Sequence, residues 1–289
     1  MISQEASNIT WLDGHFIASS SATIPIATHA LHYASSIFEG IRSYGPHIFK
    51  MQDHYERFHK SAQELGFHLP YSIPELNEAT EMLVQKKQGQ DLYIRPLAWC
   101  GTNKMTVGNR GIDVHVAIMA WERPVNRNQA PVRLIESRWR RPDPRTAPVH
   151  SKAAGLYMTS TISKNEAEAQ GYDDALLLDY RGYIAEASSS NFFIVKDAKL
   201  ITPIPHSFLN GITRLTVIDL ANTLGISVEE RDIPLAELNE ATEAFLTGTA
   251  IEILPISEIQ SAQGHFKFKE ESITNKLKQA FHQLTINKQ

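Results

Sequence analysis

Two short segments in the second half of the chain could bind a phosphate group through their backbone. Residues 210–214 (NGITR) precede a segment with helical apolar periodicity, so their N–H groups would lie at a helix N-terminus, which binds phosphate readily. Residues 247–250 (TGTA) form a turn of small residues after an apolar strand, where backbone amides can approach an anion closely. Neither pattern is specific alone, because many helices start after small residues.

Two charged side chains in the same half suit a phosphorylated, electron-withdrawing ring. Lys152 lies among small residues in HSKAAG; if partly desolvated, its pKa falls and its neutral amine can form a Schiff base. Glu186 precedes three serines between apolar runs, where a carboxylate could pair with a protonated pyridine nitrogen and keep the ring electron-withdrawing. Taken singly, each residue could equally be a solvated surface group, and the residues alone leave both interpretations open.

The elements of the second half must position these groups. Residues 132–139 read as a strand, 140–150 as an irregular loop with three prolines, and about 155–170 as a helix that follows Lys152. The later pattern predicts further elements: a hairpin of 174–179 and 183–197 through Arg181-Gly182, strand-turn-strand at 245–256, and a helix at 271–284. The helix at 211–224 is expected to bury Ile212, Leu215, Ile218 and Ala221.

The first half mixes strands and helices in the same way. A hairpin is predicted around Asp13-Gly14, a strand at 45–51, a helix at about 53–65, and two apolar strands at 92–99 and 114–121. A second helix begins at Ser72, with Pro74 in its first turn and Glu75 completing a capping box, and ends at Gly89.

Composition bounds the class of protein. The chain has 289 residues, 42% of them apolar, a net charge of −4 and a single cysteine, which predicts a globular cytoplasmic protein with no nucleic-acid or membrane partner. The polar, proline-bearing stretch near 122–131 suggests two domains: a small N-terminal domain at 1–124, a linker at 125–131 and a larger C-terminal domain at 132–289. The expected fold class is α/β (α+β).

These segments together resemble one family. The run EASSSNFF from Glu186, then LIT at 200–202 and LNGITR at 209–214, matches in residue type and spacing the fold-type IV (class IV) pyridoxal-phosphate enzymes. THALHYASSIFEGIRSY and FLTGTAIEILPI also resemble family segments. The resemblance implies a two-domain fold like that of D-amino-acid aminotransferase, with pyridoxal 5′-phosphate between the domains. It also implies a homodimer, or a higher homo-oligomer, that shares its active sites.

The resemblance carries roles over to particular residues. Lys152 matches the catalytic lysine that forms the Schiff base and moves the proton between the substrate α-carbon and the cofactor C4′. Glu186 matches the carboxylate on the pyridine nitrogen, and Tyr157 the tyrosine on the phenolic oxygen. The remaining cofactor contacts are those to its phosphate: Arg57, Ile212, Thr213 and Thr249. No residues are assigned to a metal.

Within the family, YIRPL at 93–97 resembles the branched-chain amino acid aminotransferases. There Tyr93 helps to hold the substrate α-carboxylate and Arg95 meets the side-chain carboxylate of glutamate, since a guanidinium binds a planar carboxylate through two donors. Tyr33 and Phe38 are candidates for the apolar wall that accepts leucine, isoleucine or valine, and Ala250 is a further substrate contact. The implied reaction is amino transfer between branched-chain L-amino acids and 2-oxoglutarate.

Some residues depart from the branched-chain pattern. Ser190 stands where many branched-chain enzymes have glutamate, Leu156 replaces an asparagine, and the loop 101–111 lacks the usual glycines. Nearby arginines could bind a substrate carboxylate instead: Arg140, Arg141 and Arg145. The alternatives are therefore a D-amino-acid or (R)-amine transaminase and, third, an aminodeoxychorismate lyase. Two alternatives come from other classes: a cofactor-binding protein without catalysis, and a purely structural protein, which has no use for these residues.

Overall fold

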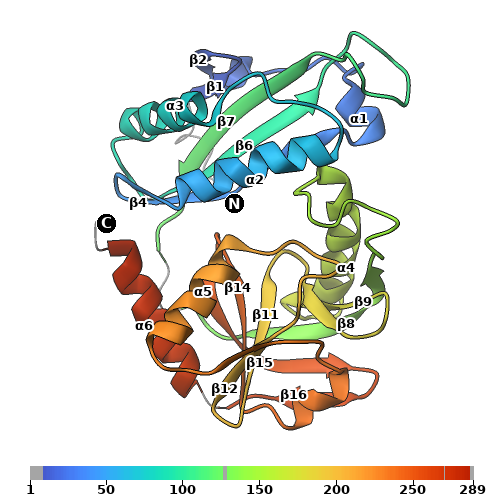
Figure 1. Cartoon of the computed structure of the whole chain (residues 1–289), viewed down its shortest axis with the longest axis vertical. Coiled ribbons are helices and arrows are strands. Elements are labelled where there is room, and N and C mark those ends of the chain that lie inside the picture. The colour runs from blue at the N-terminus through green and yellow to red at the C-terminus, as the bar shows by residue number, and fades with distance from the viewer. Residues whose placement is uncertain (1–8, 126–128, 270, 287–289) are drawn as a thin grey trace. The chain divides into compact units, whose positions relative to one another are not determined.

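The structure is a computed structural model that describes residues 9–125, 129–269 and 271–286. The chain divides into two compact units (Figure 1). The first unit comprises Met1–Asn126 together with Ser151–Gly155, and the second comprises Arg127–His150 together with Leu156–Gln289. Lys152 therefore packs with the N-terminal part of the chain. Of the predicted linker at 125–131, residues 126–128 lie outside the described residues.

The first unit is built on a seven-stranded sheet in the order β2-β1-β7-β6-β4-β5, with β3 also paired to β6. All its pairings are antiparallel. The strands are β1 (Ile9–Leu12), β2 (His15–Ala18), β3 (Ser36–Phe38), β4 (Ile41–Tyr44), β5 (His47–Phe49), β6 (Leu92–Cys100) and β7 (Val114–Glu122). The predicted turn at Asp13-Gly14 does join β1 to β2, because both residues adopt the positive φ that such a tight turn requires.

Helices complete the core of the first unit: α1 (His29–Tyr33), α2 (Met51–Glu64) and α3 (Ile73–Lys86). The capping box predicted at α3 is confirmed, because the Ser72 side chain accepts from the Glu75 N–H and the Glu75 carboxylate accepts from the Ser72 N–H. Tyr55 and Phe58 on α2 pack with Leu76 and Leu83 on α3 in one buried cluster over the sheet. This cluster makes α2 a rigid support for any residue that it carries.

The second unit contains a nine-stranded sheet in the order β10-β9-β8-β15-β14-β11-β12-β13, with β16 on β15. An additional pairing of β10 with β11 closes part of it into a barrel. The strands are β8 (Val132–Arg141), β9 (Asp174–Asp179), β10 (Ile184–Ala187), β11 (Asn191–Lys196), β12 (Lys199–Thr202), β13 (Val228–Glu230), β14 (Glu243–Gly248), β15 (Glu252–Ser261) and β16 (Gly264–Lys267). Apolar side chains such as Phe192, Ile194 and Leu246 fill one buried cluster of this unit.

Three helices accompany this sheet: α4 (Tyr157–Ala169), α5 (Ile212–Thr223) and α6 (Ser272–Ile286). Figure 1 shows α4 beside β8 and β9, and α5 with α6 beside β14, in agreement with the contacts between these elements. The mixed α/β class predicted from the sequence is confirmed by this architecture.

Two details of the second unit differ from the sequence predictions. Strand β8 continues to Arg141 rather than ending at residue 139, so part of the predicted loop at 140–150 is strand. The predicted strand at 183–197 is two strands, since Ser188–Ser190 form the turn between β10 and β11.

The predicted buried face of α5 is wrong in part: Ala221 is fully buried as predicted, but the other three residues of that face are not. Leu215 is 43% exposed and Ile218 is only partly buried, whereas Thr213, Arg214 and Val217 are buried. The helix turns a polar side inward because Arg214 finds acceptors inside the unit, so apolar periodicity alone does not identify its buried face.

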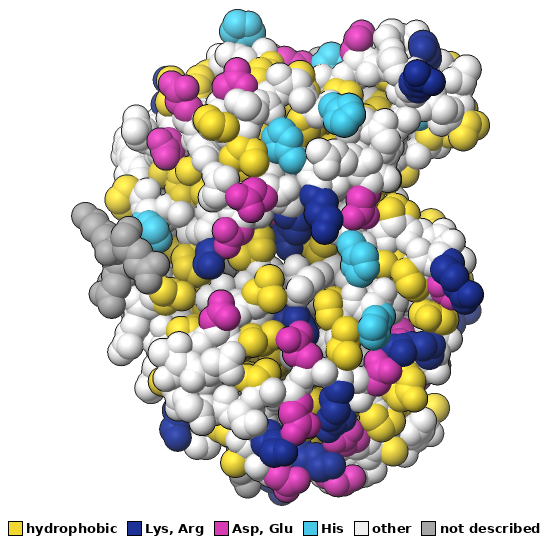
Figure 2. All heavy atoms as spheres, viewed as in Figure 1, with side chains coloured by type: hydrophobic (Ala, Val, Ile, Leu, Met, Phe, Trp, Pro, Cys, Tyr) yellow, Lys and Arg dark blue, Asp and Glu magenta, His cyan; other side chains and the backbone are white. Residues whose placement is uncertain are grey.

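The surface carries charges of both signs. On the face in view in Figure 2, lysine and arginine side chains are interspersed with aspartate and glutamate side chains. Among the described residues, no helix is both long enough and apolar enough to cross a membrane.

Candidate active site

Lys152 is held by its backbone in the first unit. Its N–H donates to Ser61 Oγ on α2 at 2.9 Å, and its carbonyl accepts from the Phe38 N–H on β3 at 3.2 Å. An isolated bridge between Ile37 and Ala153 continues this pairing. The Lys152 Nζ lies 5.0 Å from the centroid of the Phe38 ring, a cation–π distance. The predicted catalytic lysine and the predicted apolar wall residue are therefore neighbours.

A buried carboxylate holds Arg57 in one orientation. Glu39 is completely buried and accepts from Arg57 Nε at 2.6 Å and from Arg57 Nη2 at 2.9 Å. His54 Nδ1 lies 2.8 Å from the same carboxylate, and the Gly40 N–H donates to it at 3.1 Å. Two parallel bonds from a guanidinium to a carboxylate fix its plane. Arg57 is thus presented from α2 as an oriented cation.

The electrostatics of this cluster follow from burial and charge. Burial alone would raise the pKa of the Glu39 carboxyl, but the Arg57 charge and the His54 hydrogen bond outweigh it and hold that pKa well below its usual range. Burial lowers the pKa of His54, against the Glu39 hydrogen bond that raises it, and the Arg57 and Lys152 charges lower it further. Glu39 is therefore ionised, and a neutral His54 donates to it through Nδ1.

Arg95 stands in an aromatic cage in the first unit. Its guanidinium carbon lies 4.6 Å from the Phe38 ring centroid, 5.3 Å from that of Tyr93 and 6.0 Å from that of Trp121. Arg95 Nη2 donates to the Tyr93 hydroxyl at 3.0 Å, and its buried Nε has no hydrogen-bond partner among the described residues. The Arg95 Nε–H is therefore a donor that the described part of the fold does not satisfy.

Glycine is required beside this cage. A Cβ at Gly40 would stand 2.2 Å from the Tyr93 hydroxyl, so any other residue would displace the tyrosine.

Tyr33, the other predicted residue of the apolar wall, lies on α1. Its ring packs against His29 at 4.7 Å between centroids, and the residue is 41% exposed. Tyr33 thus packs against its own helix, and its place in the apolar wall stays a prediction.

In the second unit, Glu186 lies at the centre of a buried polar group. Arg141 Nε lies 3.2 Å from its Oε1, and both side chains are less than a tenth exposed, at 7% and 9%. Asn191 Nδ2 donates to Glu186 Oε2 at 3.2 Å and to the Leu209 carbonyl at 3.0 Å. Glu186 therefore has a cationic neighbour and an amide donor inside the second unit.

Arg140 and Arg141 at the end of β8 and Arg145 in the loop that follows each have a carboxylate partner. Arg141 pairs with Glu186, while Arg140 pairs with Glu136 at 3.3 Å and the exposed Arg145 pairs with Asp143. The role of Arg141 beside Glu186 was not foreseen from the sequence.

The buried side chain of Arg214 anchors the N-terminus of α5. Arg214 is fully buried and donates from Nη1 to Asn210 Oδ1 at 2.9 Å and from Nη2 to Glu230 at 2.6 Å. A Cβ on Gly211 would stand 2.1 Å from Asn191 Oδ1, so the helix start approaches the Glu186 group too closely for any side chain there. The predicted residues Ile212 and Thr213 are the first two of α5.

The turn after β14 carries two further predicted residues of this unit. Thr249 and Ala250 are partly buried between β14 and β15, where the Ile251 N–H donates to the Gly248 carbonyl at 3.2 Å. Ser190 Oγ lies 3.4 Å from the position that a Cβ of Gly248 would occupy. The serine noted as a departure therefore packs beside this turn.

Tyr157 is the first residue of α4 and lines a cavity of about 240 Å³ with Ser160, Ser188 and Ser189. Ser160 Oγ also accepts from Arg141 at 3.5 Å. Hydroxyl groups share the lining with the charged side chains of Lys164 and Glu168, and the cavity adjoins the Glu186 group through Arg141.

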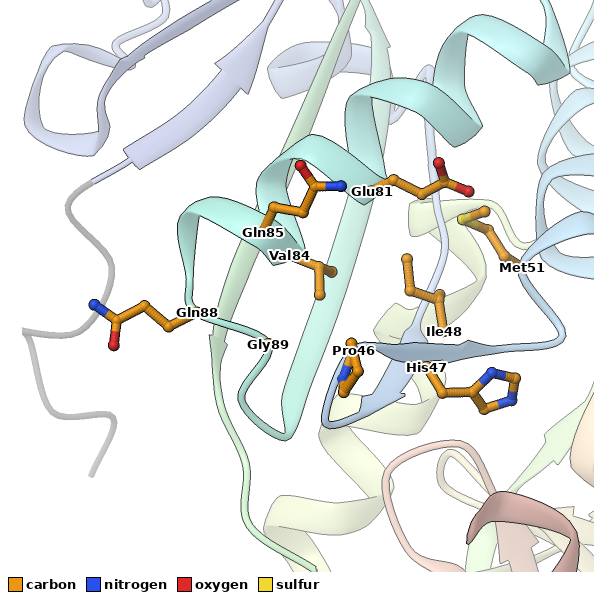
Figure 3. A pocket seen from close by; sticks show the side chains of 9 residues that line it. All are labelled: Pro46, His47, Ile48, Met51, Glu81, Val84, Gln85, Gln88 and Gly89. Carbon is orange, nitrogen blue, oxygen red and sulfur yellow. The ribbon is translucent and has the colours of Figure 1, made fainter. Parts of the chain in front are cut away.

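A larger pocket of about 600 Å³ lies elsewhere in the first unit (Figure 3). Glu81 and Gln85 reach it from α3, His47 and Ile48 from β5, and Met51 from the start of α2. Its described lining includes one carboxylate and no lysine or arginine, so it does not suit a phosphate.

The residues present fit pyridoxal phosphate. The cofactor needs a lysine, a carboxylate kept ionised for the ring nitrogen and several donors for the phosphate. The first unit contains such a lysine, Lys152, and an oriented cation, Arg57. The second unit contains a buried carboxylate, Glu186 beside Arg141, and a helix start at Gly211 that no side chain blocks. Sequence reasoning missed the supporting residues Glu39, His54, Trp121 and Asn191; the only signal for Glu39 was a charge within the otherwise apolar SIFEGI.

Comparison with known proteins identifies the family. The model of the family "Amino-transferase class IV" matches residues 36–259. The "Probable branched-chain-amino-acid aminotransferase" of Rickettsia bellii is 42% identical over 271 residues, which is 94% of this chain and 94% of the relative. The branched-chain aminotransferase of Thermoproteus uzoniensis, solved with norvaline, has a TM-score of 0.91 at 35% identity and covers 97% of this chain and 95% of its own.

A third similar protein is the branched-chain amino acid aminotransferase of Thermobaculum terrenum. Its structure is that of the holo form with pyridoxal phosphate, and it has a TM-score of 0.89 at 32% identity. The match covers 98% of this chain and 95% of that protein.

The chain therefore belongs to the class IV aminotransferases, enzymes that depend on pyridoxal 5′-phosphate. Within that class it falls with the branched-chain amino acid aminotransferases, to which it is similar over nearly its whole length. The family resemblance in the sequence is confirmed, whereas the roles of the individual site residues stay predictions.

Proposed function

We propose that this enzyme transfers the amino group reversibly between the branched-chain L-amino acids leucine, isoleucine and valine and 2-oxoglutarate. The products are the branched 2-oxo acids and L-glutamate. The observation that carries the proposal is the Arg95 cage, which combines a buried unpaired donor with the faces of Phe38, Tyr93 and Trp121. Apolar ring faces suit a hydrocarbon side chain, and the guanidinium suits the second carboxylate of glutamate.

Each residue has one task in the proposed reaction. When bound, pyridoxal phosphate supplies a carbonyl carbon that exchanges amines and a ring that withdraws electrons from the substrate α-carbon. Lys152 moves the proton between that carbon and the cofactor C4′, Glu186 holds the proton of the ring nitrogen, and Tyr157 hydrogen-bonds the phenolic oxygen. Phosphate contacts are proposed from the family match for Arg57, Ile212, Thr213 and Thr249.

We further propose that the chain works as a homodimer. Exposed apolar side chains gather on two segments of the first unit: Ile24, Ile26, Leu31 and Tyr33 on one, and Met105 and Val107 on the other. His29 joins the segments, because its Nε2 lies 2.7 Å from the Thr106 carbonyl. Exposed apolar side chains on neighbouring segments are typical of subunit interfaces. Tyr33 and Ala250 are proposed as substrate contacts from the family match alone.

The proposed substrate class is tested by adding single amino acids to the purified enzyme loaded with pyridoxal phosphate. We expect L-leucine to convert the visible absorbance band of the bound cofactor to that of the amine form, and 2-oxoglutarate to restore it. D-alanine should leave the band unchanged. A band that responds to D-alanine and not to L-leucine would assign the enzyme to the D-amino-acid alternative. Pyruvate released without any amino acceptor would indicate a lyase.

The proposed role of Arg95 predicts a selective loss. Arg95→Met keeps much of the side-chain volume but removes the donors, so the KM for 2-oxoglutarate should rise roughly tenfold to a hundredfold, as expected for one charge-assisted bond. The single-turnover rate with L-leucine should change by no more than about threefold, since leucine presents no second carboxylate. Arg140→Met, at a partly exposed arginine of the second unit, is the matched control. Equal losses for both substrates would exclude Arg95 as the carboxylate-binding residue.

A further inference from the structure

Thr247, at the end of β14, has a hydroxyl that the fold leaves without a hydrogen bond. The residue is 1% exposed, and its Oγ1 has no partner among the described residues. Threonine hydroxyls at comparable depth in this chain are bonded: Thr80 Oγ1 donates to the Leu76 carbonyl at 2.8 Å, and Thr202 Oγ1 to the Phe192 carbonyl at 2.8 Å. Buried polar groups are rarely left unpaired, so an orphaned hydroxyl needs an explanation.

The position of Thr247 in the sheet gives one. Glu186 pairs with Asn191 across β10 and β11, and Asn191 pairs with Thr247 across β11 and β14. Directly opposed residues of antiparallel strands point to the same face, so these three side chains form one polar row. The alternate residues Phe192 and Leu246 point the other way, into the apolar cluster of the unit.

The polar row ends under the proposed phosphate-binding elements. Its middle member Asn191 approaches the start of α5, where a Cβ on Gly211 would collide with it. Thr247 directly precedes the turn 248–250, which holds the predicted phosphate contact Thr249. With strands about 4.8 Å apart, Thr247 lies about 10 Å from Glu186, toward these elements rather than toward the carboxylate.

We propose that Thr247 is a further cofactor-binding residue, whose hydroxyl donates a hydrogen bond to the phosphate group of pyridoxal phosphate. This inference rests on the proposed cofactor contacts of Glu186 and the α5 N-terminus. The fold buries the hydroxyl and supplies no other acceptor among the described residues, so the hydroxyl is satisfied when the phosphate is bound. An unpaired buried hydroxyl destabilises the cofactor-free protein. Because the ligand supplies its hydrogen-bond partner, the hydroxyl favours the cofactor-bound protein over the cofactor-free one.

The test separates this role from ordinary packing. Full-length chains stripped of cofactor are titrated with pyridoxal phosphate and with pyridoxal, which lacks the phosphate, and the melting temperature of each stripped chain is measured. Thr247→Val is nearly isosteric and removes only the hydroxyl, so its Kd for pyridoxal phosphate should rise roughly tenfold to a hundredfold. Its Kd for pyridoxal should stay within about twofold of the unmodified chain, and Thr247→Ser should restore binding.

Stability supplies the second readout. Since the hydroxyl of the empty protein is unpaired, Thr247→Val should leave the melting temperature unchanged or raise it. Thr80→Val is the control: it removes a bonded hydroxyl, so it should lower the melting temperature and leave the ratio of the two Kd values as it was.

Three results would overturn the inference: unchanged binding of pyridoxal phosphate by Thr247→Val, equal weakening of both ligands, or a fall in melting temperature like that of Thr80→Val. Failure of the unmodified chain to bind pyridoxal phosphate at all would instead refute the proposed function.

Discussion

Replacement of Lys152 by alanine should abolish amino transfer while leaving the protein folded. The single-turnover rate with L-leucine is expected to fall by about 10⁴-fold or more, because one side chain serves both as the amine that exchanges with substrate and as the group that moves the proton. The Lys152 ammonium lies over the Phe38 ring, beside the Arg95 cage, so its removal takes the amine away from the proposed substrate site.

The fold should survive because Lys152 is held by its backbone. Its N–H and carbonyl are bonded to Ser61 and Phe38, and neither bond involves the side chain. Alanine keeps both, and the neighbouring Ala153 shows that a methyl group is tolerated in this segment. We therefore expect the melting temperature of the variant to stay within a few degrees of the parent.

The matched control is Lys60→Ala, which removes an exposed lysine from α2. It should leave both the rate and the visible absorbance band unchanged. The Lys152 variant should still bind pyridoxal phosphate through its other contacts, but without the band of a lysine adduct. Turnover above a few per cent of the parent rate, or a retained band, would mean that another lysine forms the adduct with the cofactor.

Where the sequence predicted well, the signal was local. The Asp13-Gly14 turn and the Ser72 capping box each depend on residues within a few positions of one another, and both are present. The family motif is also a sequence-local signal, because the types and spacing of residues 186–214 indicated the family without any knowledge of contacts. Lys152 and Phe38 are 114 positions apart, and the resemblance alone suggested that they belong to one site.

Where the sequence predicted poorly, polar groups are buried. The periodicity of α5 favoured a face with Leu215 and Ile218, but the buried side carries Thr213 and Arg214. Apolar periodicity cannot identify such a face, since the free energy of burying an arginine depends on acceptors supplied by distant strands. Glu39 was overlooked for the same reason.

The Glu39 cluster depends on elements that the sequence does not link. Glu39 follows β3, while its partners His54 and Arg57 lie on α2. A glutamate between Phe38 and Gly40 reads as an exposed loop residue until the strand and the helix are placed beside each other. Predicting it would require the contact between α2 and β3, which no local pattern records.

This cluster gives the prediction with the largest expected effect on stability. Glu39→Gln keeps the shape of the side chain but removes its charge, which leaves the Arg57 guanidinium, 15% exposed, without its anion. Breaking a buried ion pair by removing one partner typically costs about 3–5 kcal/mol, and we expect a loss of about 3 kcal/mol because glutamine retains one acceptor. Urea unfolding of the cofactor-free chain measures this loss.

The loss should depend on pH in a defined direction. The pKa of Glu39 is lowered in the folded protein from an ordinary value of 4.5, so its carboxylate contributes fully above that pH. The contribution decreases as pH falls below 4.5 towards the lowered folded pKa. The difference in unfolding free energy between the parent and Glu39→Gln should therefore be constant from about pH 6 to 8 and shrink on acidification.

A double-mutant cycle with Arg57→Met distinguishes a true pair from two independent packing effects. Because glutamine opposite methionine no longer leaves a charge unpaired, the double variant should be less destabilised than the sum of the single variants, by about 1–3 kcal/mol. Glu56→Gln, on the exposed side of α2, is the control and should change stability by less than about 0.5 kcal/mol. Additive losses, or a pH-independent difference, would show that Glu39 acts by filling space. In that case Arg57 would owe its orientation to its other contacts, and the affinity for pyridoxal phosphate should be the same in Glu39→Gln as in the parent.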